Sequence, residues 1–154
     1  QRAAKKSTVR RLNSRFPYIH AGRKVTRTAN IMIAVDQSGS VSDAMLIKIF
    51  SAMDALSKIA TFTVVPFDSE VQEEHVFEWK KGKRHQTKRV SMGGTCFQSV
   101  TDYCNKNNFD GLVIATDMEA PAPGACKVKR IWLTTPEYAE RPYFTTKEIV
   151  LQVD

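Results

Sequence analysis

The residues of this sequence that could do chemistry together are five oxygen donors. Asp36, Ser38 and Ser40 form an Asp-x-Ser-x-Ser pattern directly after an apolar run. Thr95 follows two glycines, and Asp117 follows another apolar run. Carboxylate and hydroxyl oxygens suit Mg²⁺ or Mn²⁺ better than zinc or copper. The sequence therefore predicts a divalent-cation site at these five positions, and it offers no catalytic residues.

The elements that must position these donors are strands alternating with helices. Residues 30–36, 61–67 and 110–116 are apolar runs that resemble buried strands, and residues 130–133 and 148–153 complete the parallel set. Residues 70–79 alternate as an edge or antiparallel strand does. One helix is expected from the Ser42 cap to Lys58, and a second is opened by residues 93–95. We predict an α/β, Rossmann-like fold: a mostly parallel central sheet with one antiparallel edge strand and helices on both faces.

In such sheets ligands bind beyond the carboxyl ends of the strands, where the strand order reverses. Taken alone, each motif has a simpler explanation. Asp-x-Ser-x-Ser is usually a polar turn with a capping serine, Gly-Gly-Thr a helix-start loop, and a strand-end Asp a partner of backbone amides. Their joint occurrence, in this order and at strand and helix ends, favours a metal site. Gly39 is expected to let the backbone curl around the ion.

The charge of the chain is divided unevenly. Residues 1–27 hold nine Lys and Arg and no acid, whereas residues 28–154 hold 14 basic and 16 acidic residues. We interpret 1–27 as a basic arm or linker, partly docked around residues 16–19, and 28–154 as the folded domain. Nucleic-acid binding through the arm is an alternative function, which would depend strongly on salt.

Cysteine usage and hydropathy bear on the compartment. The three cysteines (Cys96, Cys104 and Cys126) are odd in number and form no CxxC pair, which predicts reduced thiols and a cytoplasmic protein. The longest apolar runs have about five residues, too few to span a membrane. Because the chain begins with Gln1, we expect a piece of something longer.

The pattern of Asp36, Ser38, Ser40, Thr95 and Asp117 resembles the von Willebrand factor A-type (VWA, integrin I-like) domain and its metal-ion-dependent adhesion site (MIDAS). The resemblance implies that both serines ligate the metal directly. It implies that Thr95 binds directly or through water, and that both aspartates act mostly through water. One open coordination position would take an acidic group of a protein partner.

Residues 64–68 and 131–136 narrow the resemblance to the VWA-like C-terminal domain of bacterial and phage metal-dependent peptidases. This implies a larger metallopeptidase-like parent protein, whose HExxH-containing half is absent here, and a MoxR-type AAA+ ATPase as a candidate partner. Met118 stands where the family usually has the glycine of Thr-Asp-Gly, so the loop after Asp117 is expected to differ in shape.

The main competing function is Mg²⁺-dependent phosphoryl transfer, by a nuclease or phosphatase, because Asp36, Asp68 and Asp117 all end strands. Two-metal chemistry needs bridging carboxylates. No Asp-x-Asp follows the first strand and hydroxyls outnumber acids, which favours binding. Asp68 is interpreted as a turn residue, and Trp79 and Trp132 as core or sheet-edge residues.

Overall fold

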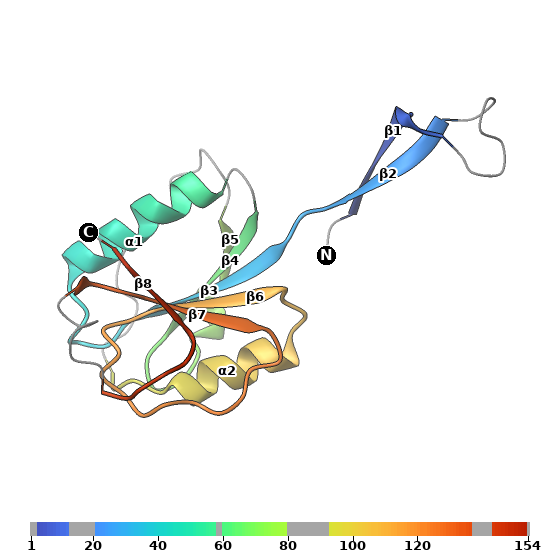
Figure 1. Cartoon of the computed structure of the whole chain (residues 1–154). Coiled ribbons are helices and arrows are strands. Elements are labelled where there is room, and N and C mark those ends of the chain that lie inside the picture. The colour runs from blue at the N-terminus through green and yellow to red at the C-terminus, as the bar shows by residue number, and fades with distance from the viewer. Residues whose placement is uncertain (1–2, 13–20, 58–59, 80–92, 137–142, 154) are drawn as a thin grey trace.

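The computed structural model describes residues 3–12, 21–57, 60–79, 93–136 and 143–153. Its main body is a six-stranded sheet in the order β5-β4-β3-β6-β7-β8 (Figure 1). The strands are β3 (Asn30–Asp36), β4 (Thr61–Phe67), β5 (Phe77–Trp79), β6 (Gly111–Ala115), β7 (Lys129–Thr134) and β8 (Ile149–Gln152). All neighbours pair in parallel except β5, which is antiparallel to β4 at the edge. The predicted fold class is confirmed.

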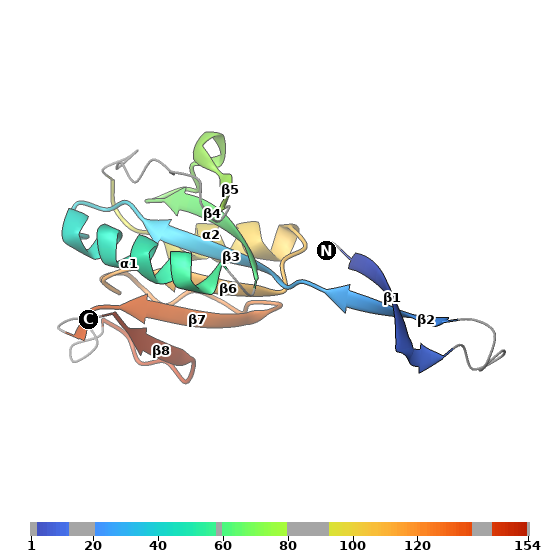
Figure 2. The ribbon, with the colours of Figure 1, turned by 90° about the horizontal axis from the view of Figure 1, so that it is seen from above.

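Two helices cover opposite faces of this sheet, as the two views show (Figures 1 and 2). Helix α1 (Asp43–Leu56) begins at Ser42, whose hydroxyl accepts a hydrogen bond from the Met45 N–H at 3.2 Å. Helix α2 (Phe97–Lys106) covers the other face. It begins later than expected, because Cys96 occupies the cap position and Thr95 remains in the preceding loop.

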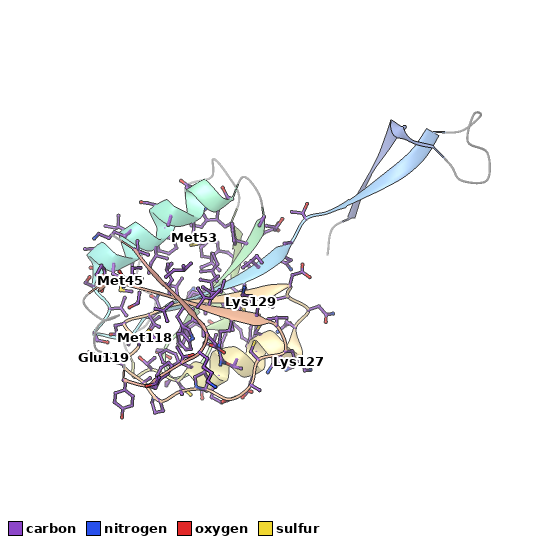
Figure 3. All side chains as sticks on the ribbon, in the orientation of Figure 1. Met45, Met53, Met118, Glu119, Lys127 and Lys129 are labelled. Carbon is purple, nitrogen blue, oxygen red and sulfur yellow. The ribbon has the colours of Figure 1, made fainter. Side chains whose placement is uncertain are left out.

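The alternation of side chains along each strand divides the core into two layers. On the α1 side, Ile33, Val35 and Ala115 pack in one cluster with apolar residues of the helix, among them Met45 and Met53 (Figure 3). On the α2 side, Ala34, Ile114 and Trp132 belong to a second cluster with Phe97, Val100 and Cys104. Trp132 and Trp79 are buried, as expected.

The strand order reverses at β3, which is the strand that leads into Asp36. The chain passes from β3 through α1 to β4 on one side, and later through α2 to β6 on the other side of β3. The carboxyl ends of β3 and β6 therefore meet where no crossover connection covers them, which is where ligands bind in open α/β sheets.

The N-terminal arm contains structure that the sequence analysis does not anticipate. Strands β1 (Ala3–Leu12) and β2 (Ala21–Arg27) pair with each other in antiparallel fashion as a separate two-stranded sheet. This ribbon extends from the amino end of β3, opposite the edge at which β3 and β6 end (Figure 2). Residues 1–27 have little apolar periodicity in the sequence, so the pattern gave no signal for this ribbon. The docking expected around residues 16–19 lies outside the described residues.

The predicted strand at residues 70–79 is also shorter than expected. A 3₁₀ turn, η1 (Glu73–His75), interrupts it: Phe77–Trp79 pairs with β4 as a strand, and Val71 forms an isolated antiparallel bridge with Phe67. The interruption has a local cause: after β4 the chain folds back at once, with the Gln72 N–H donating to the Pro66 carbonyl at 2.9 Å. The basic segment 80–89 lies outside the described residues.

Candidate metal centre

Asp36 is the last residue of β3 and is completely buried. Its Oδ1 accepts a hydrogen bond from the Ser38 N–H at 2.9 Å, and its Oδ2 accepts one from the Thr116 hydroxyl at 2.6 Å. Both carboxylate oxygens are therefore held in place by neighbouring loops. The first apolar run thus delivers its carboxylate to the sheet edge, as the sequence predicts.

Asp117 follows β6 and is also buried, with 1% of its surface exposed. Its Oδ1 accepts from the Glu119 N–H at 3.1 Å and lies 3.4 Å from the Thr116 hydroxyl. Its Oδ2 has no hydrogen-bond partner within the described part of the chain. One threonine hydroxyl thus connects two buried aspartates, one of which keeps an oxygen available.

The negative charges of Asp36 and Asp117 repel each other. Burial raises the pKa of Asp36 above its ordinary value, and the charge of Asp117 raises it further, while hydrogen bonds from Thr116 and Ser38 oppose the shift. No ion pair joins either carboxylate to a Lys or Arg of the described residues. Because unpaired buried charges are costly, this edge favours a bound cation or a proton.

The two serines of the motif lie in the loop between β3 and α1. The Oγ atoms of Ser38 and Ser40 are 3.1 Å apart; Ser38 is buried, whereas Ser40 is exposed. The structure therefore brings Asp36, Ser38, Ser40 and Asp117 to one edge. The expected role of Gly39 stays a prediction: its φ lies outside the left-handed range of +20° to +160°, and a Cβ there would meet no atom within 4 Å.

Thr95, the fifth predicted residue, is half-buried and precedes the cap of α2. Among the described residues, no side-chain hydrogen bond joins Thr95 to the other four. Its loop is attached to the end of β4 instead, through a hydrogen bond from the Cys96 N–H to the Asp68 carbonyl at 2.9 Å. A Cβ on Gly93 would lie 2.7 Å from Asp68 Oδ2, so the glycine allows this close approach.

Asp68 itself organises a turn, as the sequence analysis expects. Its Oδ1 lies within hydrogen-bonding distance of the Glu70 N–H (3.1 Å), the Gln72 side-chain amide (3.3 Å) and the Ser69 hydroxyl (3.4 Å). Oδ1 of this carboxylate is therefore engaged by its own loop, while the segment that carries Thr95 is held by the backbone carbonyl of Asp68.

Thr116 is the residue whose role the sequence analysis missed. Its hydroxyl donates to Asp36 and accepts from the Met118 N–H at 3.1 Å, so it holds both aspartate loops. Its position directly before Asp117, at the end of an apolar run, was the available signal. Register then decides its partner, because Val35 lies opposite Ala115 and the next residues, Asp36 and Thr116, are therefore neighbours.

Met118 has a φ of 64°, in the left-handed region that glycine adopts without steric cost, and its side chain is buried. Methionine therefore takes the kind of backbone conformation that a glycine would favour at this position. The substitution adds a buried side chain at the edge where Asp117 lies (Figure 3). The expected difference in the shape of this loop stays a prediction. What the structure shows is a left-handed residue with a buried side chain at this position.

The donor set fits a hard divalent cation and does not fit zinc. Among the described residues, no group of three or more His, Cys, Asp or Glu side chains could hold a metal ion. A cation here would be held by two carboxylates together with serine and threonine hydroxyls, which is an oxygen-only set suited to Mg²⁺ or Mn²⁺. The free Oδ2 of Asp117 supports that fit.

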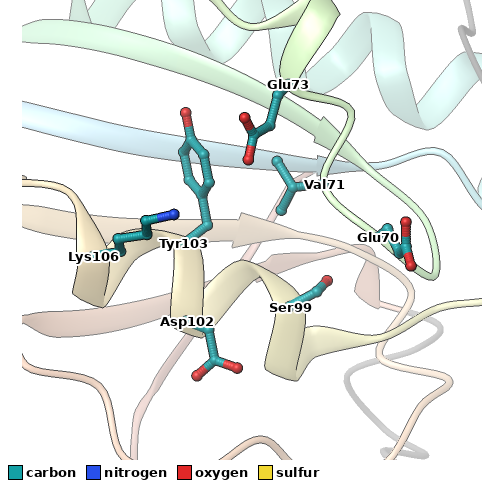
Figure 4. Close-up of a pocket in the computed structure, with 7 residues that line it drawn as sticks. All are labelled: Glu70, Val71, Glu73, Ser99, Asp102, Tyr103 and Lys106. Carbon is teal, nitrogen blue, oxygen red and sulfur yellow. The ribbon is translucent and has the colours of Figure 1, made fainter.

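A pocket lies elsewhere, between the β4–β5 connection and α2, with a volume of about 290 Å³ (Figure 4). It is lined by Glu70, Val71, Glu73, Ser99, Asp102, Tyr103 and Lys106. Burial raises the pKa of Tyr103, and the negative charge of Glu73 adds to the shift. None of the five predicted metal ligands lines this pocket.

Comparison with known proteins places the chain in a family. Residues 31–152 match the model of the VWA-like domain (DUF2201) family, and the chain belongs to that family. No curated protein matches the sequence.

Among solved structures, the chain is similar to an aerotolerance-related membrane protein from Bacteroides fragilis NCTC 9343, crystallised with multiple mutations to serines. The TM-score is 0.56 at 13% identity, over 82% of this chain and 92% of that one, so the likeness concerns the fold. In the part of the chain described here, no helix is long and apolar enough to cross a membrane.

Proposed function

We propose that this domain is a divalent-metal-dependent protein-binding module. In this proposal Mg²⁺ or Mn²⁺ is held by Asp36, Ser38, Ser40, Thr95 and Asp117, and a carboxylate of a protein partner takes the remaining coordination position. The observation that carries the proposal is the buried Oδ2 of Asp117, which has no hydrogen-bond partner among the described residues and belongs to an aspartate beside a second buried one, Asp36. A cation would neutralise both carboxylates and supply the missing partner.

The hydrogen bonds that Asp68 accepts within its own loop favour a binding function over phosphoryl transfer. The enzyme hypothesis needs strand-end acids that can bridge two ions. Asp68 Oδ1 already has three potential donors within its own loop. That leaves two aspartates and several hydroxyls, which suits one ion. A titration that finds two bound ions per chain would favour the enzyme instead.

The first test is a thermal-shift titration with MgCl₂ or MnCl₂. Stabilisation should follow RT ln(1 + [L]/Kd), about 2.7 kcal/mol at a hundredfold excess over Kd. We expect it in the wild type and not in D36A or D117N, the latter being the milder change because it keeps the shape of the side chain. D110N is the matched control, since Asp110 precedes the opposite end of β6. No shift with either ion in the wild type would contradict the proposal.

The second test concerns the partner. The family resemblance points to a MoxR-type AAA+ ATPase as the partner. It also implies that this domain is the C-terminal part of a larger metallopeptidase-like protein. The domain would capture that ATPase in Mg²⁺ and release it on chelation, and D117N would not capture it. Capture that is unchanged by chelation would show that the contact does not use the metal.

A further inference from the structure

One row of side chains crosses the sheet beside the candidate metal centre. Val35, Ala115 and Leu133 lie opposite one another on β3, β6 and β7. The next residues, Asp36, Thr116 and Thr134, therefore continue the register. The residues two positions before them, Ala34, Ile114 and Trp132, all belong to the core cluster beneath α2. Asp36, Thr116 and Thr134 thus share the α2 face, and each is 0% exposed.

The third member of this row has an unsatisfied hydroxyl. Thr116 donates to Asp36 at 2.6 Å. Thr134 Oγ1 is buried and has no hydrogen-bond partner among the residues that the structure describes. The free Oδ2 of Asp117 belongs to the same neighbourhood, because Asp117 Oδ1 lies 3.4 Å from the Thr116 hydroxyl. Thr134 is one strand away from Thr116, a spacing of about 4.8 Å.

An unsatisfied buried hydroxyl destabilises a protein, and a valine of the same shape would avoid that cost. The contrast within this chain is Thr101, which is equally buried but donates to the Phe97 carbonyl at 3.0 Å and accepts from Arg130 at 2.9 Å. Thr134 has neither kind of partner in the part of the chain that the structure describes. Its hydroxyl is therefore suited to a partner that arrives with the ligand.

We infer that Thr134 is a positioning residue of the proposed metal centre: its Oγ1 would accept a hydrogen bond from a water of the hydrated cation. The inference rests on the proposed function and extends its site by one strand. Water molecules on a divalent cation are strong donors, and a threonine hydroxyl has lone pairs to accept from them. Outer partners of this kind change metal affinity by about 10- to 100-fold when they are removed.

The test measures two quantities on each variant: the Tm without metal, and the Mn²⁺ dissociation constant from calorimetry. T134V should raise the metal-free Tm by about 2–4 °C, because the unsatisfied hydroxyl is removed. The same variant should weaken Mn²⁺ binding by about 10-fold. T134S keeps the hydroxyl and should bind Mn²⁺ within about 2-fold of the wild type. A merely structural role for Thr134 would not produce that rescue.

T101V is the matched control. It removes a hydroxyl with two partners, so it should lower the Tm by about 2–4 °C and leave Mn²⁺ affinity unchanged. If the wild type binds Mn²⁺ and T134V binds it with the same affinity, this inference is overturned while the proposed function stands. A wild-type protein that does not bind Mn²⁺ would overturn the proposed function and this inference with it.

Discussion

Asp68 directly follows β4, and Asp117 follows β6 after one residue, Thr116; both are buried, yet the two carboxylates have different surroundings. Asp68 Oδ1 has three donors from its own loop, whereas Asp117 Oδ2 has none among the described residues. In both cases the residue is an aspartate just beyond an apolar strand. The comparison teaches that the local turn, and not residue type or sequence context, decides whether a buried aspartate keeps an oxygen without a partner.

The most direct test of this comparison is to remove the carboxylate of Asp68. D68A should lower the free energy of unfolding by about 2–3 kcal/mol, because the Glu70 N–H and its neighbours lose their acceptor. It should keep the Mn²⁺ response, since the backbone carbonyl of residue 68 still accepts from Cys96. Urea unfolding with and without MnCl₂ measures both effects. If D68A also abolished the Mn²⁺ response, Asp68 would belong to the metal centre and the enzyme hypothesis would gain support.

The loop after β6 can be examined through Met118. M118A should cost about 2–5 kcal/mol of stability, because a fully buried side chain is lost while φ stays positive. M118G loses the same side chain but relieves roughly 1 kcal/mol of left-handed strain. We therefore expect glycine to be more stable than alanine here, by about 1 kcal/mol in urea unfolding. The usual order, with alanine more stable, would show that the positive φ is not retained in solution.

A third acid, Glu148, is saturated by partners from β7 and provides a pH test. It accepts hydrogen bonds from Arg130 Nε and Nη2, both at 2.8 Å, and from the Trp132 indole at 2.7 Å. Burial acts to raise the pKa of Glu148, but these hydrogen bonds and the charge of Arg130 outweigh burial and lower it below the ordinary 4.5.

Since the folded-state pKa of Glu148 is depressed, its contribution to stability is complete above pH 4.5 and is lost as the pH falls through the folded-state pKa. E148Q should therefore cost about 1–2 kcal/mol at pH 7 and progressively less in acid. Urea unfolding of both proteins between pH 7 and pH 3 measures the difference. If the difference in unfolding free energy between the wild type and E148Q stayed constant over this range, the charge of Glu148 would not contribute to stability.

The smallest effects are expected at the glycines of the two loops. G93A places a methyl group 2.7 Å from Asp68 Oδ2 and should cost about 1 kcal/mol. G39A meets no atom within 4 Å and has no positive φ, so it should stabilise the protein by about 0.5 kcal/mol. Thermal unfolding of the pair measures both signs. A destabilised G39A would support the special backbone role that the sequence suggested.

Several of these features could be predicted from the sequence because their causes are local. The apolar runs ending at Asp36 and Asp117 indicate strands, and Ser42 caps its helix as expected. The ribbon β1–β2 was missed because residues 1–27 show little apolar periodicity, although their backbones pair. The late start of α2 was missed because Cys96 caps it without a side-chain hydrogen bond.

By itself, the sequence determined which donors are available: hard oxygens at Asp36, Ser38, Ser40, Thr95 and Asp117, each next to a strand or helix end. Only the tertiary structure decided how they are used. Register places Thr116 against Asp36 and extends the row to Thr134, and the local turn engages Asp68 while leaving Asp117 Oδ2 available. The physical reason is that hydrogen-bond saturation depends on which strands become neighbours, and strand order is a property of the whole chain.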